Sequence, residues 1–154
     1  MSFARHLLIV YHTQTGHTRT MAHAVLRGAR QVPEVKTRLK MALRANLDDL
    51  LWAHGLLLGT PENFGYMSGA LKNFLDRTYY PAQGKISGLP YAVFISAGND
   101  GTGALNSIER IARGYPLKPV CDPIIARGEL DAEALERCEE LGETMASGVA
   151  WGIF

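Results

Sequence analysis

Runs of consecutive apolar residues recur along this chain, and segments with apolar residues at helical spacing separate them. Residues 7–10, 56–58 and 91–95 are three such runs, each predicted to be a β-strand. Their lack of polar alternation is typical of strands buried on both faces of a sheet. Residues 35–41 alternate instead and predict a more exposed strand. Residues 120–125 predict a weaker fifth strand, because Pro119 and Pro123 interrupt it.

The segments between these strands predict helices. Met21, Ala22, Val25, Leu26 and Ala29 follow the first strand at helical spacing. Asn46 is a suitable N-cap for a short helix through Trp52, and Ser68 for a helix with an apolar face over residues 71–79. Further helices are expected over 105–112 and 129–149.

Strands that alternate with helices predict an α/β fold with a doubly wound parallel sheet and helices on both faces, a three-layer α/β/α sandwich. The commonest order for five such strands is 2-1-3-4-5. The length of 154 residues fits one domain, so we expect residues 1–154 to form a single unit. Ligands of such sheets bind beyond the carboxyl ends of the strands, which directs attention to the loops after strands 1, 3 and 4.

Composition and charge narrow the function classes. The hydrophobic share is 47 % and the charged share 20 %, as in ordinary globular domains. No apolar run approaches the roughly 20 residues of a membrane helix, and no signal peptide is visible, so we expect a cytoplasmic protein without a membrane role. The net charge of +1 gives no basic excess for binding nucleic acid.

The loop after the first strand has the composition of a phosphate site. Hydroxyl groups and free backbone N–H groups at a helix N-terminus bind anions, and a glycine lets the backbone approach closely. The alternative is a polar turn in which a threonine caps the helix. The candidate residues are Thr13, Gln14, Thr15, Gly16, His17 and Thr18.

The loop after the third strand carries two aromatic residues around a glycine. A flat ring system would use aromatic walls and backbone polar groups of this kind. Gly65 would supply a flexible peptide for a ligand atom whose protonation changes with redox state. The alternative is that the aromatic rings only cover the sheet edge. The candidate residues are Pro61, Glu62, Asn63, Phe64, Gly65 and Tyr66.

The loop after the fourth strand is rich in glycine, which marks special backbone geometry. The alternative is a long turn into the next helix. The candidate residues are Ser96, Ala97, Gly98, Asn99, Asp100 and Gly101.

Together these motifs resemble the flavodoxin superfamily, and within it the FMN-dependent NAD(P)H:quinone oxidoreductases of the Trp repressor-binding type. The resemblance lies in Gly16-His17 followed by Thr20-Met21, in Gly59-Thr60-Pro61, and in Phe64-Gly65-x-Met67-Ser68-Gly69 running on to Phe74-Leu75-Asp76. The chain departs from these reductases in being shorter between Thr78 and Leu89. It also has Arg113-Gly114-Tyr115 in the region of their later histidine.

The resemblance implies a flavodoxin-like, FMN-binding oxidoreductase that passes electrons from NAD(P)H through FMN to a quinone or similar small acceptor. Residues 13–18 would hold the phosphate, residues 62–64 would line the isoalloxazine, and residues 96–101 would meet its pyrimidine edge. No catalytic side chain is implied, because the flavin supplies the chemistry. Two alternatives stay open, a flavodoxin-type electron carrier serving a protein partner and a protein of this fold without redox turnover. Association into a homo-oligomer is also left open.

Other motifs in the sequence do not support a further catalytic or metal-binding function. Cys121 and Arg127 have the spacing of a phosphatase loop, but no glycine lies between them to aim N–H groups at a phosphate. The thiols of Cys121 and Cys138 are expected to be small structural groups. The five histidines form no metal-binding motif with carboxylates, so no metal site is expected.

Overall fold

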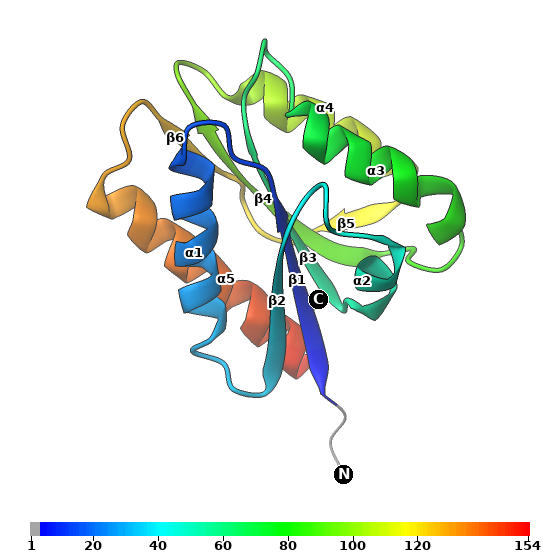
Figure 1. Cartoon of the computed structure of the whole chain (residues 1–154). Helices are drawn as coiled ribbons and strands as arrows, with labels where there is room; N and C mark the ends of the chain where they lie inside the picture. Colours follow the sequence, from blue (N-terminus) through cyan, green and yellow to red (C-terminus); the bar gives the residue numbers. More distant parts are fainter. Residues whose placement is uncertain (1–3) are drawn as a thin grey trace.

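The computed structural model describes residues 4–154, and its strands form one parallel sheet (Figure 1). The strands are β1 (Arg5–Tyr11), β2 (Val35–Met41), β3 (Gly55–Pro61), β4 (Leu89–Ala97), β5 (Leu117–Pro119) and β6 (Ile124–Arg127). Their order is β2-β1-β3-β4-β5, with β6 pairing beside β5 on the same edge of β4. This confirms the predicted order 2-1-3-4-5.

Helices cover both faces of the sheet. The helices are α1 (His17–Ala29), α2 (Leu47–Trp52), α3 (Gly69–Ala82), α4 (Thr102–Gly114) and α5 (Ala132–Trp151). Helices α1 and α5 lie on one face, and α2, α3 and α4 lie on the other (Figure 1). Among residues 4–154, no helix combines the length and the apolar character needed to cross a bilayer.

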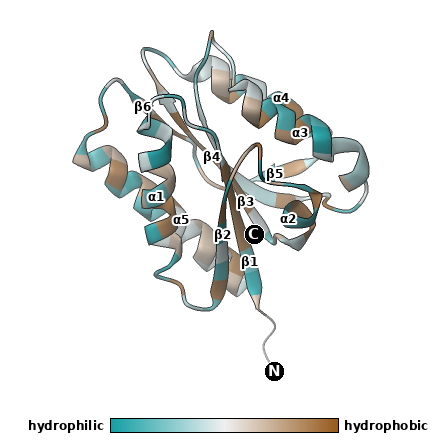
Figure 2. Ribbon diagram, viewed as in Figure 1, coloured by the Kyte–Doolittle hydropathy of each residue, from teal (hydrophilic) through white to brown (hydrophobic). Residues whose placement is uncertain are grey.

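Two hydrophobic clusters, one on each side of the sheet, explain the unbroken apolar runs. Leu8 and Val10 of β1 pack into the cluster below α3 and α4. Leu7 and Ile9 pack into the cluster below α1 and α5. Side chains of a strand alternate between faces, so a strand covered on both faces must be apolar at every position. The ribbon coloured by hydropathy shows this apolar centre between helices with polar outer surfaces (Figure 2).

The predicted helix caps are confirmed. Asn46 accepts a hydrogen bond from the Asp49 N–H at 3.2 Å, and the Asp49 carboxylate accepts one from the Asn46 N–H at 3.0 Å. This reciprocal pair is a capping box. The Ser68 hydroxyl accepts a hydrogen bond from the Leu71 N–H at 3.1 Å and starts α3.

The prediction of one strand over residues 120–125 was wrong. The strand is split into β5 and β6, and residues 120–123 lie outside the sheet. Pro119 and Pro123 flank the break, and neither has an N–H to donate to the ladder. The last helix also begins later than predicted, at Ala132, because Asp131 accepts a hydrogen bond from the Ala134 N–H at 2.8 Å and caps it.

Candidate functional site

Three loops meet at the carboxyl ends of adjacent strands. They follow β1, β3 and β4, which are neighbours in the sheet order, so the three candidate segments gather at one end of the molecule (Figure 1). The first loop contains residues 12–16, the second 62–68 and the third 98–101. The arrangement predicted from the sequence is therefore the one found.

The first loop leaves the N-terminus of α1 without an acidic cap. Gly16 is the N-cap and has a φ of 107°, a conformation that favours glycine. It has no side chain to cap the helix, and the first turn contains no acidic residue. The Thr13 hydroxyl accepts hydrogen bonds from the Gly16 and Arg19 N–H groups at 3.0 and 3.4 Å. The exposed Thr15 hydroxyl stands beside this helix end, where the helix dipole favours an anion.

Thr18 has a different environment from Thr15. Its side chain is buried, and its hydroxyl lies 2.7 Å from the Ser96 hydroxyl of the third loop region. This bond ties the first turn of α1 to the end of β4. Thr18 thus belongs to the wall of the site, with its hydroxyl already paired within the protein.

The second loop is a tight hairpin that presents an aromatic ring to solvent. Asn63 and Tyr66 exchange two backbone hydrogen bonds, at 2.9 and 3.0 Å. The central residues Phe64 and Gly65 have φ values of 53° and 70°, as a type I′ turn requires. A positive φ is a genuine outlier for a bulky residue such as phenylalanine. Phe64 is fully exposed and Tyr66 is 42 % exposed, so the hairpin holds aromatic surface with nothing against it.

Glu62 does not turn toward the open space between the loops. Its carboxylate accepts hydrogen bonds from the Gly101 and Ala104 N–H groups, at 2.9 and 3.0 Å. These groups belong to the N-terminus of α4, whose own N-cap is a glycine without a side chain. Glu62 therefore caps α4 across 39 and 42 residues of sequence. The N–H groups at the start of α4 thus bond to a carboxylate, whereas the N–H groups of Gly16 and Arg19 at the start of α1 bond to the neutral Thr13 hydroxyl.

The second loop also touches the first turn of α4 through its backbone. A Cβ atom on Gly103 would lie 2.2 Å from the Gly65 carbonyl oxygen. Only glycine permits so close an approach. Gly65 itself has open space around it, so its φ of +70° is the only restraint on a side chain there.

The third loop combines buried and exposed residues. Ser96 and Ala97 are buried, while Gly98, Asn99 and Asp100 are exposed. The Asp100 carbonyl accepts a hydrogen bond from the Arg127 guanidinium at 2.8 Å. The exposed peptides of residues 98–100 thus form a rim next to the aromatic hairpin.

Residues at the end of β6 also border the site, and the sequence analysis did not assign them to it. Arg127 contacts Asp100, and the Gly128 N–H donates to the Ala97 carbonyl at 2.8 Å. The exposed Glu129 carboxylate lies 3.8 Å from the His17 ring. The prediction missed this loop because it ended the fifth strand at residue 125 and began the last helix at residue 129. In the structure, β6 ends at Arg127 and α5 begins at Ala132.

The two thiols lie away from these loops and lack the environment of a nucleophile. Burial raises the pKa of Cys138 to about 11. Burial and the neighbouring Asp122 raise the pKa of Cys121. Reactive cysteines have a lowered pKa. The Arg127 side chain, which would grip the phosphate in a phosphatase loop, bonds to Asp100 instead.

Comparison with known proteins identifies the family. Residues 31–115, more than half of the chain, match the family model for NADPH-dependent FMN reductases. A flavodoxin of Aquifex aeolicus is 33 % identical over 160 residues, which cover 94 % of this chain and 86 % of that protein. An NAD(P)H dehydrogenase (quinone) of Acidithiobacillus ferrooxidans is 33 % identical over 111 residues, which cover 58 % of this chain and 56 % of that protein.

Solved structures agree on the fold. The WrbA-like flavodoxin of Agrobacterium tumefaciens aligns with a TM-score of 0.78 and 24 % identity, over 97 % of this chain and 99 % of that one. The sheet order matches the one that the motifs implied. The chain therefore belongs to the flavodoxin superfamily and, within it, to the NADPH-dependent FMN reductase family.

Proposed function

We propose that the three loops bind FMN and that the protein is a reductase, which takes electrons from NAD(P)H and delivers them to a small acceptor such as a quinone. The observation that carries the FMN proposal is the contrast between two helix ends. The N-terminus of α4 is capped by the Glu62 carboxylate, while that of α1 has an exposed threonine and no acidic residue in its first turn. A terminal phosphate therefore has one favourable place among these loops, at residues 13–17.

The other two loops fit the ring system of a flavin. Phe64 and Tyr66 offer exposed aromatic surface for stacking, and the exposed peptides of residues 98–100 offer hydrogen-bonding groups for a polar ring edge. The flavin would supply the redox chemistry, by accepting a hydride and passing its electrons on. The role of the protein residues is to bind and orient it, and no side chain of the site is proposed as a general acid or base.

The family supports an oxidoreductase, and one relative supports the kind of acceptor. The A. ferrooxidans relative is a quinone dehydrogenase by name, but the chain spans only 56 % of its length. Quinone as the acceptor and NAD(P)H as the donor are accordingly proposals for this chain.

An absorption spectrum under anaerobic conditions tests the reductase proposal. The purified protein, loaded with FMN, should show the flavin bands and lose them when NADH or NADPH is added. Re-oxidation by an added benzoquinone should restore the bands. Bands that persist with both nicotinamides and disappear only with dithionite would contradict the reductase proposal and favour a carrier.

One observation favours that second candidate, an electron carrier with a basic protein partner. Residues 129–143 contain seven acidic residues and one basic residue, so this window has a net charge of −6. The rest of the chain, with eight acidic and fifteen basic residues, has a net charge of +7. The overall charge of +1 is therefore the sum of a strongly acidic segment and a basic remainder. The acidic segment begins at Glu129, on the rim of the site. Such a surface would steer a basic partner toward the site.

A further inference from the structure

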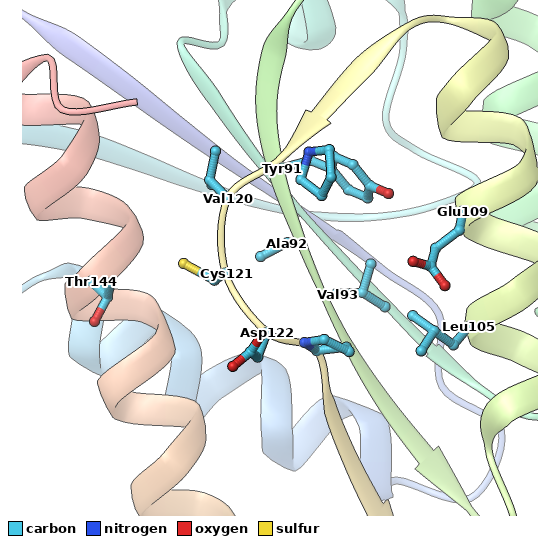
Figure 3. A pocket seen from close by; sticks show the side chains of 11 residues that line it. Tyr91, Ala92, Val93, Leu105, Glu109, Val120, Cys121, Asp122 and Thr144 are labelled. Carbon is cyan, nitrogen blue, oxygen red and sulfur yellow. The ribbon is translucent and has the colours of Figure 1, made fainter.

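The break in the fifth strand opens a gap at the edge of the sheet. Tyr91 of β4 pairs with Pro119, and Phe94 pairs with Ile124. Two residues of β4 thus face the four residues 120–123. The Val120 N–H still donates to the Tyr91 carbonyl at 3.2 Å, and the residues after it arch away from the sheet. The gap lies between the central part of β4 and this arch (Figure 3). No residue of the three loops of the candidate site lines it.

A cavity of about 660 Å³ occupies this gap. Its apolar lining includes Val93, Leu105, Pro119 and Val120. Its polar lining comes from Tyr91, Glu109, Cys121, Asp122 and Thr144. The volume lies within the range of about 300–1,000 Å³ that small-molecule sites occupy.

Tyr91 brings an unpartnered hydroxyl to this cavity. The residue is only 3 % exposed, and its hydroxyl forms no hydrogen bond with any residue of the described part of the chain. Its ring extends from β4 toward α4, with the hydroxyl directed to the side where Glu109 lies (Figure 3). Burial, and then the nearby Glu109 carboxylate, raise the pKa of this phenol, while the positive charge of Arg113 acts to lower it. The net shift is upward, so the hydroxyl stays neutral and can donate or accept a hydrogen bond. The hydroxyl oxygen is not fully enclosed by protein, so it is free to bond to a ligand in the cavity that Tyr91 lines.

The two charged residues that line the cavity are both acidic. Glu109 is half-buried, and within residues 4–154 no cation lies within ion-pair distance of its carboxylate. Asp122 adds a second carboxylate, and none of the lining residues is Lys, Arg or His. The nearest basic residue along α4, Arg113, is exposed and does not line the cavity. A cationic ligand would be favoured here over a neutral or anionic one.

We infer that this cavity binds a small organic cation, a protonated amine on an apolar body. The ammonium group would lie between the Glu109 carboxylate and the Tyr91 hydroxyl. The apolar body would cover Val93, Leu105 and Pro119, which are otherwise exposed to the cavity. This site is separate from the FMN site and does not depend on it.

Titration of the full-length protein with 2-phenylethylamine tests the inference, with backbone amide NMR shifts as the readout. At pH 7 the probe is a cation with an aromatic body. We expect saturable shifts confined to the amides of residues 91–93, 105–109 and 120–122. The neutral 2-phenylethanol should bind at least tenfold more weakly, and 3-phenylpropionate should not bind.

Two variants and one control identify the contacts. Glu109→Gln keeps the size and removes the charge, and it should weaken amine binding roughly tenfold or more. Tyr91→Phe should weaken it by a smaller factor. Glu133→Gln removes the same charge from the exposed surface of α5, outside the cavity, and should leave binding unchanged. Thermal unfolding of each variant shows that it is folded.

The inference would be overturned if the amine produced no saturable shifts at the cavity. Equal binding by 3-phenylpropionate, or the same loss of affinity in Glu109→Gln and Glu133→Gln, would also overturn it. Binding of a lysine-containing peptide without binding of the free amine would overturn it as well, and would assign the cavity to a protein partner.

Discussion

Phe64 holds a backbone conformation that phenylalanine rarely adopts, and its ring contacts nothing. A φ of 53° costs a residue with a Cβ atom about 1–2 kcal/mol relative to a right-handed conformation. Asparagine tolerates this region, and Asn-Gly is the preferred centre of a type I′ turn. Phe64 therefore occupies a turn position that asparagine would fill with less strain. A strained residue of this kind is typical of a binding site.

Replacing Phe64 with asparagine should separate stability from binding. We expect Phe64→Asn to stabilise the flavin-free protein by about 1 kcal/mol, because the strain is relieved. The same change should weaken FMN binding, because the stacking surface is lost. Thermal unfolding and flavin fluorescence measure the two effects. The control, Phe64→Ala, removes the ring but has no polar side chain to hydrogen-bond the local backbone, so it should weaken binding without the gain in stability. Undiminished FMN affinity in both variants would show that the ring does not contact the cofactor.

Thr18 and Thr15 lie in the same loop region but should respond differently to substitution. Thr18→Val removes a buried hydroxyl and leaves Ser96 without its partner at 2.7 Å. The expected cost is about 1–3 kcal/mol in the free energy of unfolding, measured with urea. Thr15 is exposed, so Thr15→Ala should change this free energy little. Equal stability of the two variants would contradict the pairing of Thr18 with Ser96.

At the scale of elements, α1 and α5 pack through two glycines. A Cβ atom on Gly142 would lie 1.9 Å from the Val25 carbonyl oxygen, and one on Gly28 would lie 1.8 Å from that of Glu139. The helices must separate to admit a methyl group, since both obstacles are backbone atoms. This close contact anchors α1, whose first turn forms the proposed phosphate site.

Gly142→Ala should therefore destabilise the protein by at least the 1–3 kcal/mol typical of overpacked cores. Gly114→Ala is the matched control, because Gly114 also lies in a helix and nothing stands within 4 Å of a Cβ atom there. This control should be neutral or stabilise the fold by up to about 1 kcal/mol. Urea unfolding of both variants compares them directly. A Gly142→Ala protein as stable as the control would contradict the close packing of α1 on α5.

The starts of β1 and β3 are joined by a contact that is sensitive to pH. The His54 Nδ1 atom accepts a hydrogen bond from the His6 backbone N–H at 2.9 Å, so this nitrogen carries no proton. Burial, and then the positive charges of Arg5 and His6, lower the pKa of His54 below its ordinary value of 6.5. The unfolded chain therefore binds a proton at a higher pH than the folded protein does, and stability falls as the pH drops below 6.5.

We expect the wild-type protein to lose more stability between pH 7.5 and pH 5.5 than the variant His54→Gln. Both proteins contain the other titrating groups, so the difference between their losses reports on His54. Urea unfolding at the two pH values gives the four free energies needed. Identical losses in the two proteins would show that His54 does not prefer its neutral form in the folded state.

At the scale of the whole molecule, the elements were predictable because their signals are local. A strand buried on both faces is apolar at every position, and Asn46 and Ser68 cap the helices that immediately follow them. The three loops could be predicted to meet because the carboxyl ends of parallel strands share one edge.

The contacts between loops had no such local signal. Glu62 caps α4 across about forty residues, and Thr18 pairs with Ser96 across 78 residues. The left-handed conformation of Phe64 could not be predicted either, because phenylalanine rarely adopts a positive φ. Pro119 and Pro123 did signal an interruption of the fifth strand, but only the pairing with β4 reveals its width.

The central claim, FMN bound with its phosphate at the N-terminus of α1, is tested most directly by comparing two flavins. Flavin-free protein would be titrated with FMN and with riboflavin, and fluorescence quenching would give both dissociation constants. We expect FMN to bind at least tenfold more tightly, since a hydrogen bond to a charged group contributes about 1.5–3 kcal/mol. Thr15→Ala should weaken FMN binding and leave riboflavin binding unchanged. Equal affinity for the two flavins, or no saturable binding of either, would contradict the account.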